Sequence, residues 1–127
     1  MSYNFLIVDD SKTARMMLSK TLRISGIDIG EIFMASDGGQ ALSLLKDNWI
    51  DLVITDLHMP VMGGVEMLHS MAEDGLLESV PVVVVSSDAS LTRREDLSRQ
   101  GIRDYLCKPV RPEQVKSVVE EILELAK

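Results

Sequence analysis

The chain has 127 residues, the usual size of one domain, and 46% of them are hydrophobic. This composition predicts a globular chain with its own core and excludes a disordered, collagen-like or disulfide-dependent protein. Thirteen Lys and Arg residues against twenty Asp and Glu residues give a net charge of −7, so we expect no binding of nucleic acid. The single cysteine, Cys107, cannot form an internal disulfide, and no apolar run approaches the ~18 residues of a membrane span. We therefore expect a cytoplasmic protein without a membrane anchor.

Five short apolar runs rich in β-branched residues predict five strands along the chain. They cover Phe5–Val8, Glu31–Ala35, Leu52–Thr55, Val82–Val85 and Asp104–Cys107. The third and fourth runs are almost continuously apolar, which is typical of a parallel sheet with helices over both faces. The runs therefore favour the α/β class.

The segments between these runs have the residue spacing of helices. In the first segment, the side chains that share one helical face are Ala14, Met17, Leu18, Thr21 and Leu22, and Gly26 ends the helix. Asp37 and Gln40 form a capping pair that predicts the start of the second helix. Trp49, near the end of this helix, is expected to pack over the entry to the third strand.

The remaining helices also have start signals. Gly64 precedes the third helix, Ser90 caps the fourth, and Pro112 opens the fifth. The buried stripe of the fifth helix is predicted to be Val115, Val118, Val119, Ile122 and Leu125. Four methionines near the third helix are assigned mainly to the core, namely Met59, Met62, Met67 and Met71. Strand and helix alternate five times, so we expect one α/β domain over residues 1–127 with no output domain.

Polar residues collect where the predicted strands end. Asp9 and Asp10 follow the first strand, Asp56 the third, Ser86 and Ser87 the fourth, and Lys108 the fifth. Ligands of open parallel sheets bind beyond the carboxyl ends of the strands. This edge is therefore the candidate functional site.

Three carboxylates at one edge need neutralising charge. Each like-charge pair at ~4 Å costs about 4 kcal/mol at an effective dielectric constant near 20. Lys108 supplies one positive charge, and Mg²⁺ with its preference for oxygen ligands supplies more. A carboxylate beside Mg²⁺ and a lysine can attack phosphorus to form an acyl phosphate, so phosphorylation of an aspartate is the leading hypothesis.

Simpler explanations exist for the same residues. Asp9 or Asp10 precedes the first helix and can act as its cap and favourable charge. Asp56 can be a turn aspartate before Pro60 and Gly63. The conjunction of these acids with Lys108 favours the phosphorylation hypothesis over the separate roles.

These motifs resemble the receiver domain of bacterial two-component response regulators over essentially the whole chain. The matching residues are Leu6–Ser11 (LIVDDS), Thr55–Gly64 (TDLHMPVMGG), Ser86, Tyr105 and Lys108-Pro109. Each fragment is weak alone, but their order and spacing together are specific. The resemblance implies a doubly wound, flavodoxin-like (βα)5 fold, with strand order 2-1-3-4-5 and helices on both faces.

The resemblance also implies a role for each matching residue. Asp56 accepts a phosphoryl group from the phosphohistidine of a histidine kinase or phosphotransfer protein. Asp10, Asp56 and the backbone carbonyl of His58 hold Mg²⁺, while Asp9 binds the ion mainly through water. Lys108 contacts the phosphoryl oxygens, and the bond before Pro109 is commonly cis in the family.

The same resemblance implies how the signal leaves the site. After phosphorylation, Ser86 moves to bond the new oxygens, and Tyr105 turns inward into the space that Ser86 vacates. Residues 90–116 carry seven basic and four acidic groups in a chain of net −7. A solvated face is one interpretation, and a docking face for an acidic downstream protein is the other, formed by Arg93, Arg94, Arg99, Arg103 and Arg111.

The sequence interpretation is a stand-alone, monomeric phosphoacceptor switch, with a chemotaxis-type adaptor as the first hypothesis. It is not an enzyme beyond its own phosphotransfer and dephosphorylation. Alternatives are a degenerate receiver that acts by contact alone and a phosphorelay intermediate. An aspartyl phosphatase needs the pattern Asp-x-Asp after the first strand, but in this chain Asp9 and Asp10 are adjacent. A flavin-binding module needs a hydroxyl-rich loop to bind the flavin phosphate, but the corresponding turn in this chain, Asp9–Lys12, is acidic.

Overall fold

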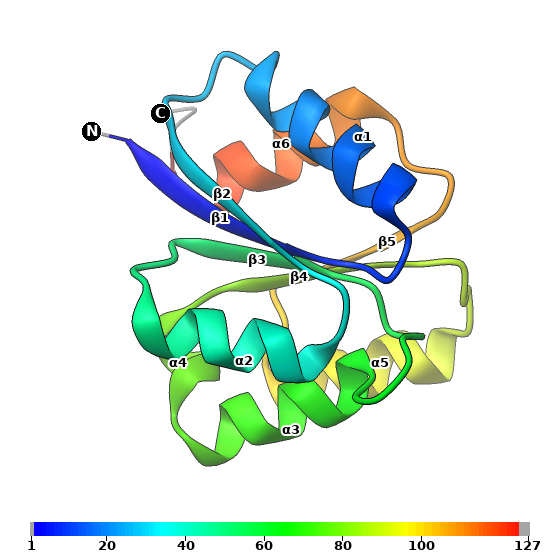
Figure 1. The fold of residues 1–127 in the computed structure, drawn as a ribbon. Helices are drawn as coiled ribbons and strands as arrows, with labels where there is room; N and C mark the ends of the chain where they lie inside the picture. Colours follow the sequence, from blue (N-terminus) through cyan, green and yellow to red (C-terminus); the bar gives the residue numbers. More distant parts are fainter. Residues whose placement is uncertain (1, 125–127) are drawn as a thin grey trace.

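The structure is a computed structural model, and it describes residues 2–124. Within these residues the chain forms a five-stranded parallel sheet of order β2-β1-β3-β4-β5 with helices on both faces (Figure 1). This topology confirms the predicted fold class, including the strand order that the resemblance implied.

The strands are β1 (Tyr3–Val8), β2 (Ile29–Ala35), β3 (Leu52–Thr55), β4 (Val82–Ser86) and β5 (Asp104–Cys107). The helices are α1 (Lys12–Arg23), α2 (Gly38–Asp47), α3 (Gly64–Glu73), α4 (Leu76–Ser79), α5 (Leu91–Gln100) and α6 (Pro112–Ile122). All five predicted strands are present, although β1 and β2 begin earlier than the apolar runs suggested. The sequence did not predict α4, because a four-residue helix has no apolar repeat to detect.

Hydrogen-bonding side chains fix the helix starts. Asp37 accepts the backbone N–H of Gln40 at 2.9 Å, and Ser90 accepts that of Arg93 at 3.2 Å, which confirms both predicted caps. Pro112 is the first residue of α6, also as predicted. The start of α3 at Gly64 has no side-chain cap, because the preceding residue is Gly63.

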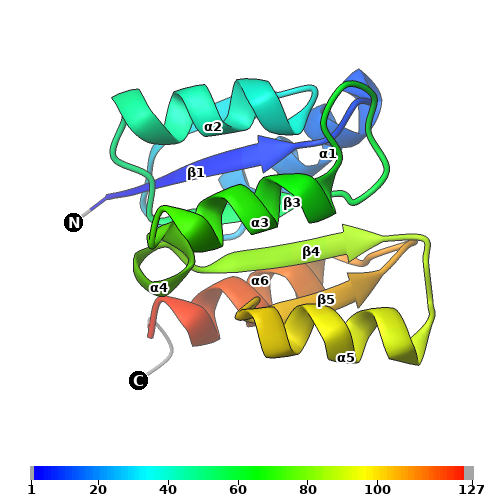
Figure 2. The ribbon, with the colours of Figure 1, turned by 90° about the horizontal axis from the view of Figure 1, so that it is seen from below.

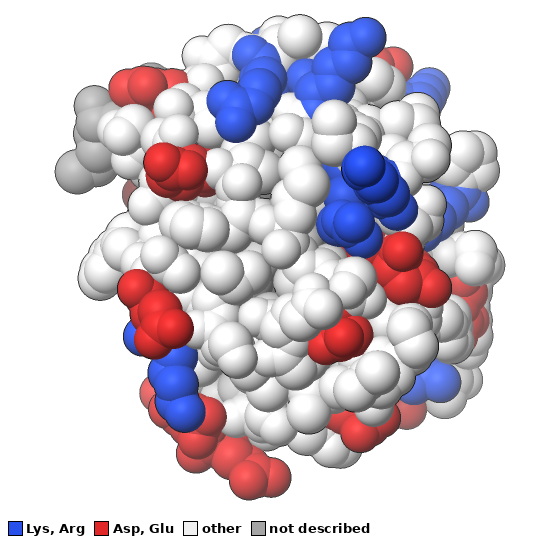
Figure 3. All heavy atoms as spheres, in the orientation of Figure 1, with Lys and Arg blue, Asp and Glu red and all other residues white. Residues whose placement is uncertain are grey.

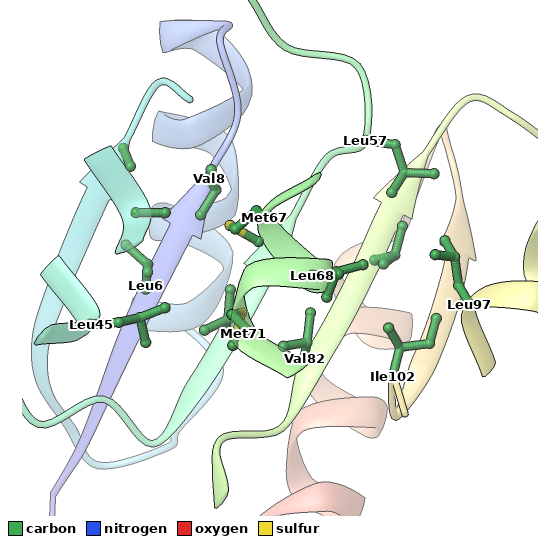
Figure 4. Close-up of a cluster of buried hydrophobic side chains, with 14 of the residues drawn as sticks. Leu6, Val8, Leu45, Leu57, Met67, Leu68, Met71, Val82, Leu97 and Ile102 are labelled. Carbon is green, nitrogen blue, oxygen red and sulfur yellow. The ribbon is translucent and has the colours of Figure 1, made fainter. Parts of the chain in front are cut away.

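Two apolar clusters lie on opposite faces of the sheet. One packs α2, α3 and α5 against the sheet, and its buried side chains include Leu45, Met67, Met71 and Leu97 (Figures 2 and 4). The other packs α1 and α6 against the opposite face. Met67 and Met71 are fully buried, as predicted, while Met59 and Met62 are partly buried against the same cluster. The sheet therefore has both faces covered and only its edges open.

In α6 the predicted stripe is present as far as the structure describes it. Val115 and Val119 are buried, and Val118 and Ile122 are partly buried against the same cluster. Leu125 lies outside the described residues. No helix within residues 2–124 has the length and apolar character needed to cross a membrane.

Two expectations about packing were wrong. Met17 was placed on the buried face of α1, but its side chain is 66% exposed, and the buried residues of this helix are Leu18, Ser19 and Leu22. Trp49 was expected to pack over the sheet and is 78% exposed. Its Nε1 donates a hydrogen bond to Asp51 Oδ1 at 3.0 Å, which holds the indole at the surface.

Candidate functional site

Parallel strand register brings the predicted acidic residues to one edge. Val8 of β1 pairs with Thr55 of β3, so the residues that follow them, Asp9 and Asp56, leave the sheet side by side. The Asp56 N–H donates to the carbonyl of Val8 at 2.9 Å, which fixes this alignment. The site is thus a direct consequence of two adjacent strands ending at the same level.

Three carboxylates meet at this edge. Oxygens of Asp9, Asp10 and Asp56 all lie within 4.8 Å of one another. Asp9 is buried, Asp56 is half-buried and Asp10 is exposed. Like charges at such separations repel one another, less strongly at exposed Asp10, where solvent screens the charge. The sheet therefore holds together groups that destabilise it unless positive charge is supplied.

Lys108, at the end of β5, supplies part of that charge. Its Nζ lies 3.2 Å from Oδ2 of Asp9 and 3.2 Å from Oδ2 of Asp56. Partial burial acts to lower the pKa of Lys108, but the hydrogen bond to Asp9 and the charges of Asp56 and Asp9 outweigh it, so the pKa is raised. The ammonium stays charged at neutral pH. The peptide bond between Lys108 and Pro109 is cis, as the resemblance implied.

Backbone donors orient the two more buried carboxylates. Asp9 Oδ1 accepts the N–H of Ser11 at 2.9 Å, and Asp56 Oδ1 accepts the N–H of Leu57 at 2.7 Å. The second oxygen of each group then faces Lys108. Among residues 2–124, no hydrogen bond or ion pair is made by the carboxylate of Asp10, so its oxygens are available to a ligand.

Arg15 is a feature of the site that the sequence did not reveal. Its Nη1 donates to the backbone carbonyl of Asp9 at 2.6 Å, which ties the first turns of α1 to the acidic edge. A basic residue in the first turn of the helix after two aspartates was the available signal. It was missed because the helical spacing of this segment identifies its apolar face and does not show which backbone groups a basic side chain reaches.

Ser86 and Tyr105 lie together on the side of the site nearest α5. Ser86 is fully buried, and its Oγ accepts the N–H of Asp88 at 3.1 Å. The hydroxyl of Tyr105 donates to the carbonyl of Asp88 at 2.5 Å, so this side chain is already turned inward. Burial raises the pKa of the Tyr105 phenol, and the contact with Ser86 only partly offsets this. Ser87, the other predicted hydroxyl, is exposed.

Gly64 has a structural requirement that the sequence did not reveal. A Cβ at this position would overlap the carbonyl oxygen of Asp56 and lie 2.9 Å from the Cα of Leu57. The Gly64 N–H also donates to the carbonyl of Leu57 at 2.9 Å. Only glycine therefore allows α3 to begin this close to the end of β3.

An open apolar groove of about 450 Å³ borders the acidic edge between α1 and the loop that leads to α6. Asp9 and Lys108 of the site are part of its lining, together with Met17, Leu18, Val85, Pro109, Val110 and Val115. The exposed side chain of Met17 is part of this lining, which explains the apolar residue at a surface position. The groove places apolar surface directly beside the charged site.

The five arginines of the predicted docking face are largely paired. Ion pairs join Arg93 to Asp88, Arg94 to Asp104, Arg99 to Glu95 and Asp96, and Arg111 to Glu113. Within residues 2–124, the side chain of Arg103 has no such partner. These ion pairs reduce the unpaired positive charge of that face. They leave its role in binding a partner as a prediction.

The helix α1 carries a second group of cations. Its sequence, KTARMMLSKTLR, contains Lys12, Arg15, Lys20 and Arg23 and no acidic residue. Figure 3 shows Lys and Arg side chains gathered over the region where Figure 1 places this helix. In the part of the chain that the structure describes, no ion pair joins these α1 cations to a carboxylate. Lys12 and Arg15 lie in the turn of α1 that follows the acidic edge, and Lys20 and Arg23 lie in its last turn.

The arrangement defines a class of protein: a doubly wound α/β domain with an acidic, lysine-containing site at the carboxyl edge of its sheet. Residues 5–120 match the family described as the response regulator receiver domain. The chain belongs to this family.

Relatives and solved structures agree with this assignment. The chain is 32% identical to the two-component response regulator ARR7 of Arabidopsis thaliana over 126 residues, covering 93% of this chain and 61% of ARR7. It is 35% identical to ORR3 of rice (Oryza sativa subsp. indica), covering 93% of this chain and 88% of that protein. The chain thus spans less than two thirds of ARR7.

Two chemotaxis proteins have similar structures. The chemotaxis response regulator CheY4 of Vibrio cholerae superposes with a TM-score of 0.84 at 28% identity, covering 96% of this chain and 99% of CheY4. CheY from the CheX-CheY-BeF3-Mg complex of Borrelia burgdorferi gives a TM-score of 0.86 at 27% identity, covering 95% of this chain and 89% of that chain. The fold is therefore that of a CheY-like receiver domain.

The donor set is suited to a hard divalent cation. Receiver domains bind Mg²⁺ at an acidic pocket, and Asp9, Asp10 and Asp56 form such a cluster here. All of its donors are oxygens, and Asp10 has both carboxylate oxygens free of partners within residues 2–124. Mg²⁺ favours a few carboxylates together with water, which fits a cluster that is buried on one side and open on the other.

Proposed function

We propose that this chain is a phosphoacceptor switch whose acceptor is Asp56. The observation that carries the proposal is the convergence of Asp9, Asp10 and Asp56 within 4.8 Å, with Lys108 bonded to two of the three. The phosphoryl donor is the phosphohistidine of a histidine kinase or a phosphotransfer protein. Membership of the receiver family supports this class of partner.

Metal binding is assigned to the most accessible oxygens. Asp10, Asp56 and the backbone carbonyl of His58 would hold Mg²⁺, and Asp9 would contribute mainly through water, because its side chain is more buried than that of Asp56. When bound, the ion offsets negative charge on the transferring phosphoryl group. The protein's contribution is to hold these oxygens at one edge before the donor arrives.

In the transfer step, a carboxylate oxygen of Asp56 forms a bond to phosphorus. The bond from phosphorus to the donor imidazole nitrogen breaks, and its electron pair remains on that nitrogen. The Lys108 ammonium, already 3.2 Å from Asp56, shifts to contact the phosphoryl oxygens and stabilises their charge. Apart from this transfer and the hydrolysis of the acyl phosphate, in which water takes the phosphoryl group and inorganic phosphate leaves, the chain has no enzymatic role.

The response to phosphorylation starts at Ser86. Its hydroxyl oxygen now accepts the N–H of Asp88, and the side chain moves so that its O–H donates to a phosphoryl oxygen, which alters the loop between β4 and α5. Tyr105 donates to the carbonyl of Asp88 and therefore senses the same loop. These residues link the acceptor to the surface of α5. A small change at the site can therefore shift the loop between β4 and α5 from one packing arrangement to another.

Output is by contact with a downstream protein at the face formed by Arg93, Arg94, Arg99, Arg103 and Arg111. Because four of these side chains are paired to acids, Arg103 is the free cation there among the described residues. The chain acts as one monomeric receiver domain over residues 1–127. A chemotaxis-type adaptor fits the CheY-like fold, while a phosphorelay intermediate and a degenerate receiver are alternatives.

The test is phosphorylation by a small donor. The protein is incubated with Mg²⁺ and acetyl phosphate and followed by intact mass spectrometry, with Asp56→Asn as the variant. Asp51→Asn is the matched control, because Asp51 lies at the other end of β3. We expect one phosphoryl group on the wild type and on the control and none on Asp56→Asn. Absence of uptake by the wild type, or unchanged uptake by Asp56→Asn, would contradict the proposal.

A further inference from the structure

The loop between β3 and α3, residues 57–63, has a strained backbone; we call it the acceptor loop. Val61 has a φ of 66°, in the left-handed region that β-branched residues rarely adopt. The N–H of Met62 donates to the carbonyl of Pro60 at 2.7 Å, which is the hydrogen bond of a γ-turn around Val61. Such a backbone conformation is unfavourable by itself and persists only when its surroundings hold it.

Packing of Val61 itself does not hold this conformation. Its side chain is 91% exposed, so it gains little from burial. The constraint must therefore act on neighbouring residues of the acceptor loop.

The first turn of α2 supplies such a constraint. The N–H of Gly38, the first residue of α2, donates to the carbonyl of Met62 at 2.8 Å. The first N–H groups of a helix have no partner within the helix, so this donor is free to bind another segment. The hydrogen bond follows Val61 directly in the chain and ties the strained turn to α2.

Gly38 is required for space and not for backbone conformation. It is buried, and its φ lies outside the left-handed region. A Cβ at this position would lie 2.8 Å from Met62 Cγ, 3.0 Å from Met62 Sδ and 3.0 Å from Met67 Cβ. The absence of a side chain at residue 38 therefore allows Met62 to lie against the start of α2.

We propose that Gly38 is a positioning residue for the phosphoacceptor site, acting through Met62 to hold the acceptor loop. This inference rests on the proposed function, because that function assigns a ligand to this loop, the carbonyl of His58. The loop follows Asp56 directly and closes through the bond from the Gly64 N–H to the Leu57 carbonyl. A shift at Met62 is thus transmitted along a short, closed loop to the metal ligands.

The test compares Gly38→Ala with Gly39→Ala. The two glycines are adjacent in the same helical turn, but a Cβ at residue 39 would meet only Asp37 Oδ1, at 3.3 Å. We expect Gly38→Ala to weaken the apparent Mg²⁺ affinity of phosphorylation by about tenfold, as changes behind metal ligands commonly do. The maximal rate at saturating Mg²⁺ should change much less, and Gly39→Ala should match the wild type in both.

A second readout needs no metal. Hydrogen–deuterium exchange of residues 57–63 in Mg²⁺-free protein should be faster in Gly38→Ala than in Gly39→Ala. Two second-site substitutions should rescue Gly38→Ala. Met62→Ala makes room for the methyl group added at residue 38. Val61→Gly removes the backbone strain at residue 61, so the acceptor loop keeps its conformation with a weaker constraint. Each should restore part of the Mg²⁺ affinity in the Gly38→Ala background, and the first also covers the case in which Gly38→Ala alone folds poorly.

The outcomes separate this inference from the proposed function. Equal Mg²⁺ affinity and equal loop exchange in the two alanine variants would overturn the positioning role while leaving Asp56 as acceptor. If the wild type takes up no phosphoryl group, the proposed function fails, and faster loop exchange in Gly38→Ala would still support the role of Gly38 in holding the loop. Loss of affinity without any rescue would also overturn the inference, because it indicates general destabilisation.

Discussion

The strand β3 has an aspartate beside each end, and the two have opposite surroundings. At the amino end, Asp51 accepts the N–H of Asn4 at 2.8 Å and the Nε1–H of Trp49 at 3.0 Å. At the carboxyl end, Asp56 shares one ammonium with Asp9 and also lies near Asp10. One end is a satisfied network and the other has excess negative charge.

This difference separates structural from functional aspartates. The amino-end network is completed by Asn4, whose side chain donates to the Trp49 carbonyl at 2.8 Å and accepts the Glu31 N–H at 2.9 Å. Such an arrangement stabilises the fold and needs no ligand. The carboxyl end lowers the stability of the protein alone and gains from a cation, which is the property expected of a binding site.

The largest effect is expected from Lys108→Ala, which removes the cation that the carboxyl end already has. Loss of one group that stabilises developing charge should lower the rate of phosphorylation by acetyl phosphate about 100-fold at saturating Mg²⁺. The Mg²⁺ affinity should not fall, since the ammonium no longer competes for Asp56. Phosphorylation rates from intact mass spectrometry across a Mg²⁺ titration measure the maximal rate and the apparent Mg²⁺ affinity. A maximal rate within about twofold of the wild type would refute the role assigned to Lys108.

A pair of Asp→Asn variants should then show opposite effects on stability. Asp51→Asn replaces an acceptor oxygen with a donor and should lower the free energy of unfolding by about 1–2 kcal/mol. Asp10→Asn relieves repulsion at an exposed position and should raise it by about 0.5 kcal/mol without Mg²⁺. Urea denaturation followed by circular dichroism measures both. The comparison between the two ends fails if both variants are destabilised equally.

Added Mg²⁺ sharpens the same comparison. It should stabilise the wild type and Asp51→Asn by binding the folded state, and should stabilise Asp10→Asn much less. This measurement does not depend on phosphorylation.

The smallest effect is on the pH dependence of stability. The pKa values of Lys108 and Tyr105 are both raised in the folded state, so each group binds its proton more strongly there than in the unfolded chain. Their contributions are fully present below the unfolded pKa values, about 10, and are lost as pH rises through the folded values. Stability should therefore fall in alkaline solution, and less steeply in Tyr105→Phe than in the wild type. Equal slopes from urea denaturation across an alkaline pH series would contradict this assignment.

Much of the fold could be predicted because its signals are local. The apolar runs of β3 and β4, the caps Asp37 and Ser90, and Pro112 each act within a few residues. Met17 and Trp49 were placed wrongly because their exposure depends on tertiary surroundings. Met17 lines an open groove beside α1, and Trp49 donates a hydrogen bond to Asp51 at the surface.

The candidate site was predictable in its residues but not in its supports. Asp9, Asp10, Asp56 and Lys108 follow strand ends, so parallel pairing alone brings them together. The contacts of Arg15 and Gly64 with the site, and of Gly38 with Met62, cannot be derived in this way, because they depend on distances between segments that the sequence pattern does not place.

The most direct measurement of the central claim is the rate of phosphoryl uptake from acetyl phosphate as Mg²⁺ is titrated from a chelated start, with the modified residue located by peptide mapping. We predict uptake that is negligible in chelator, rises to saturation with Mg²⁺ and maps to Asp56. Equal uptake in chelator, or modification at another residue, would contradict the account.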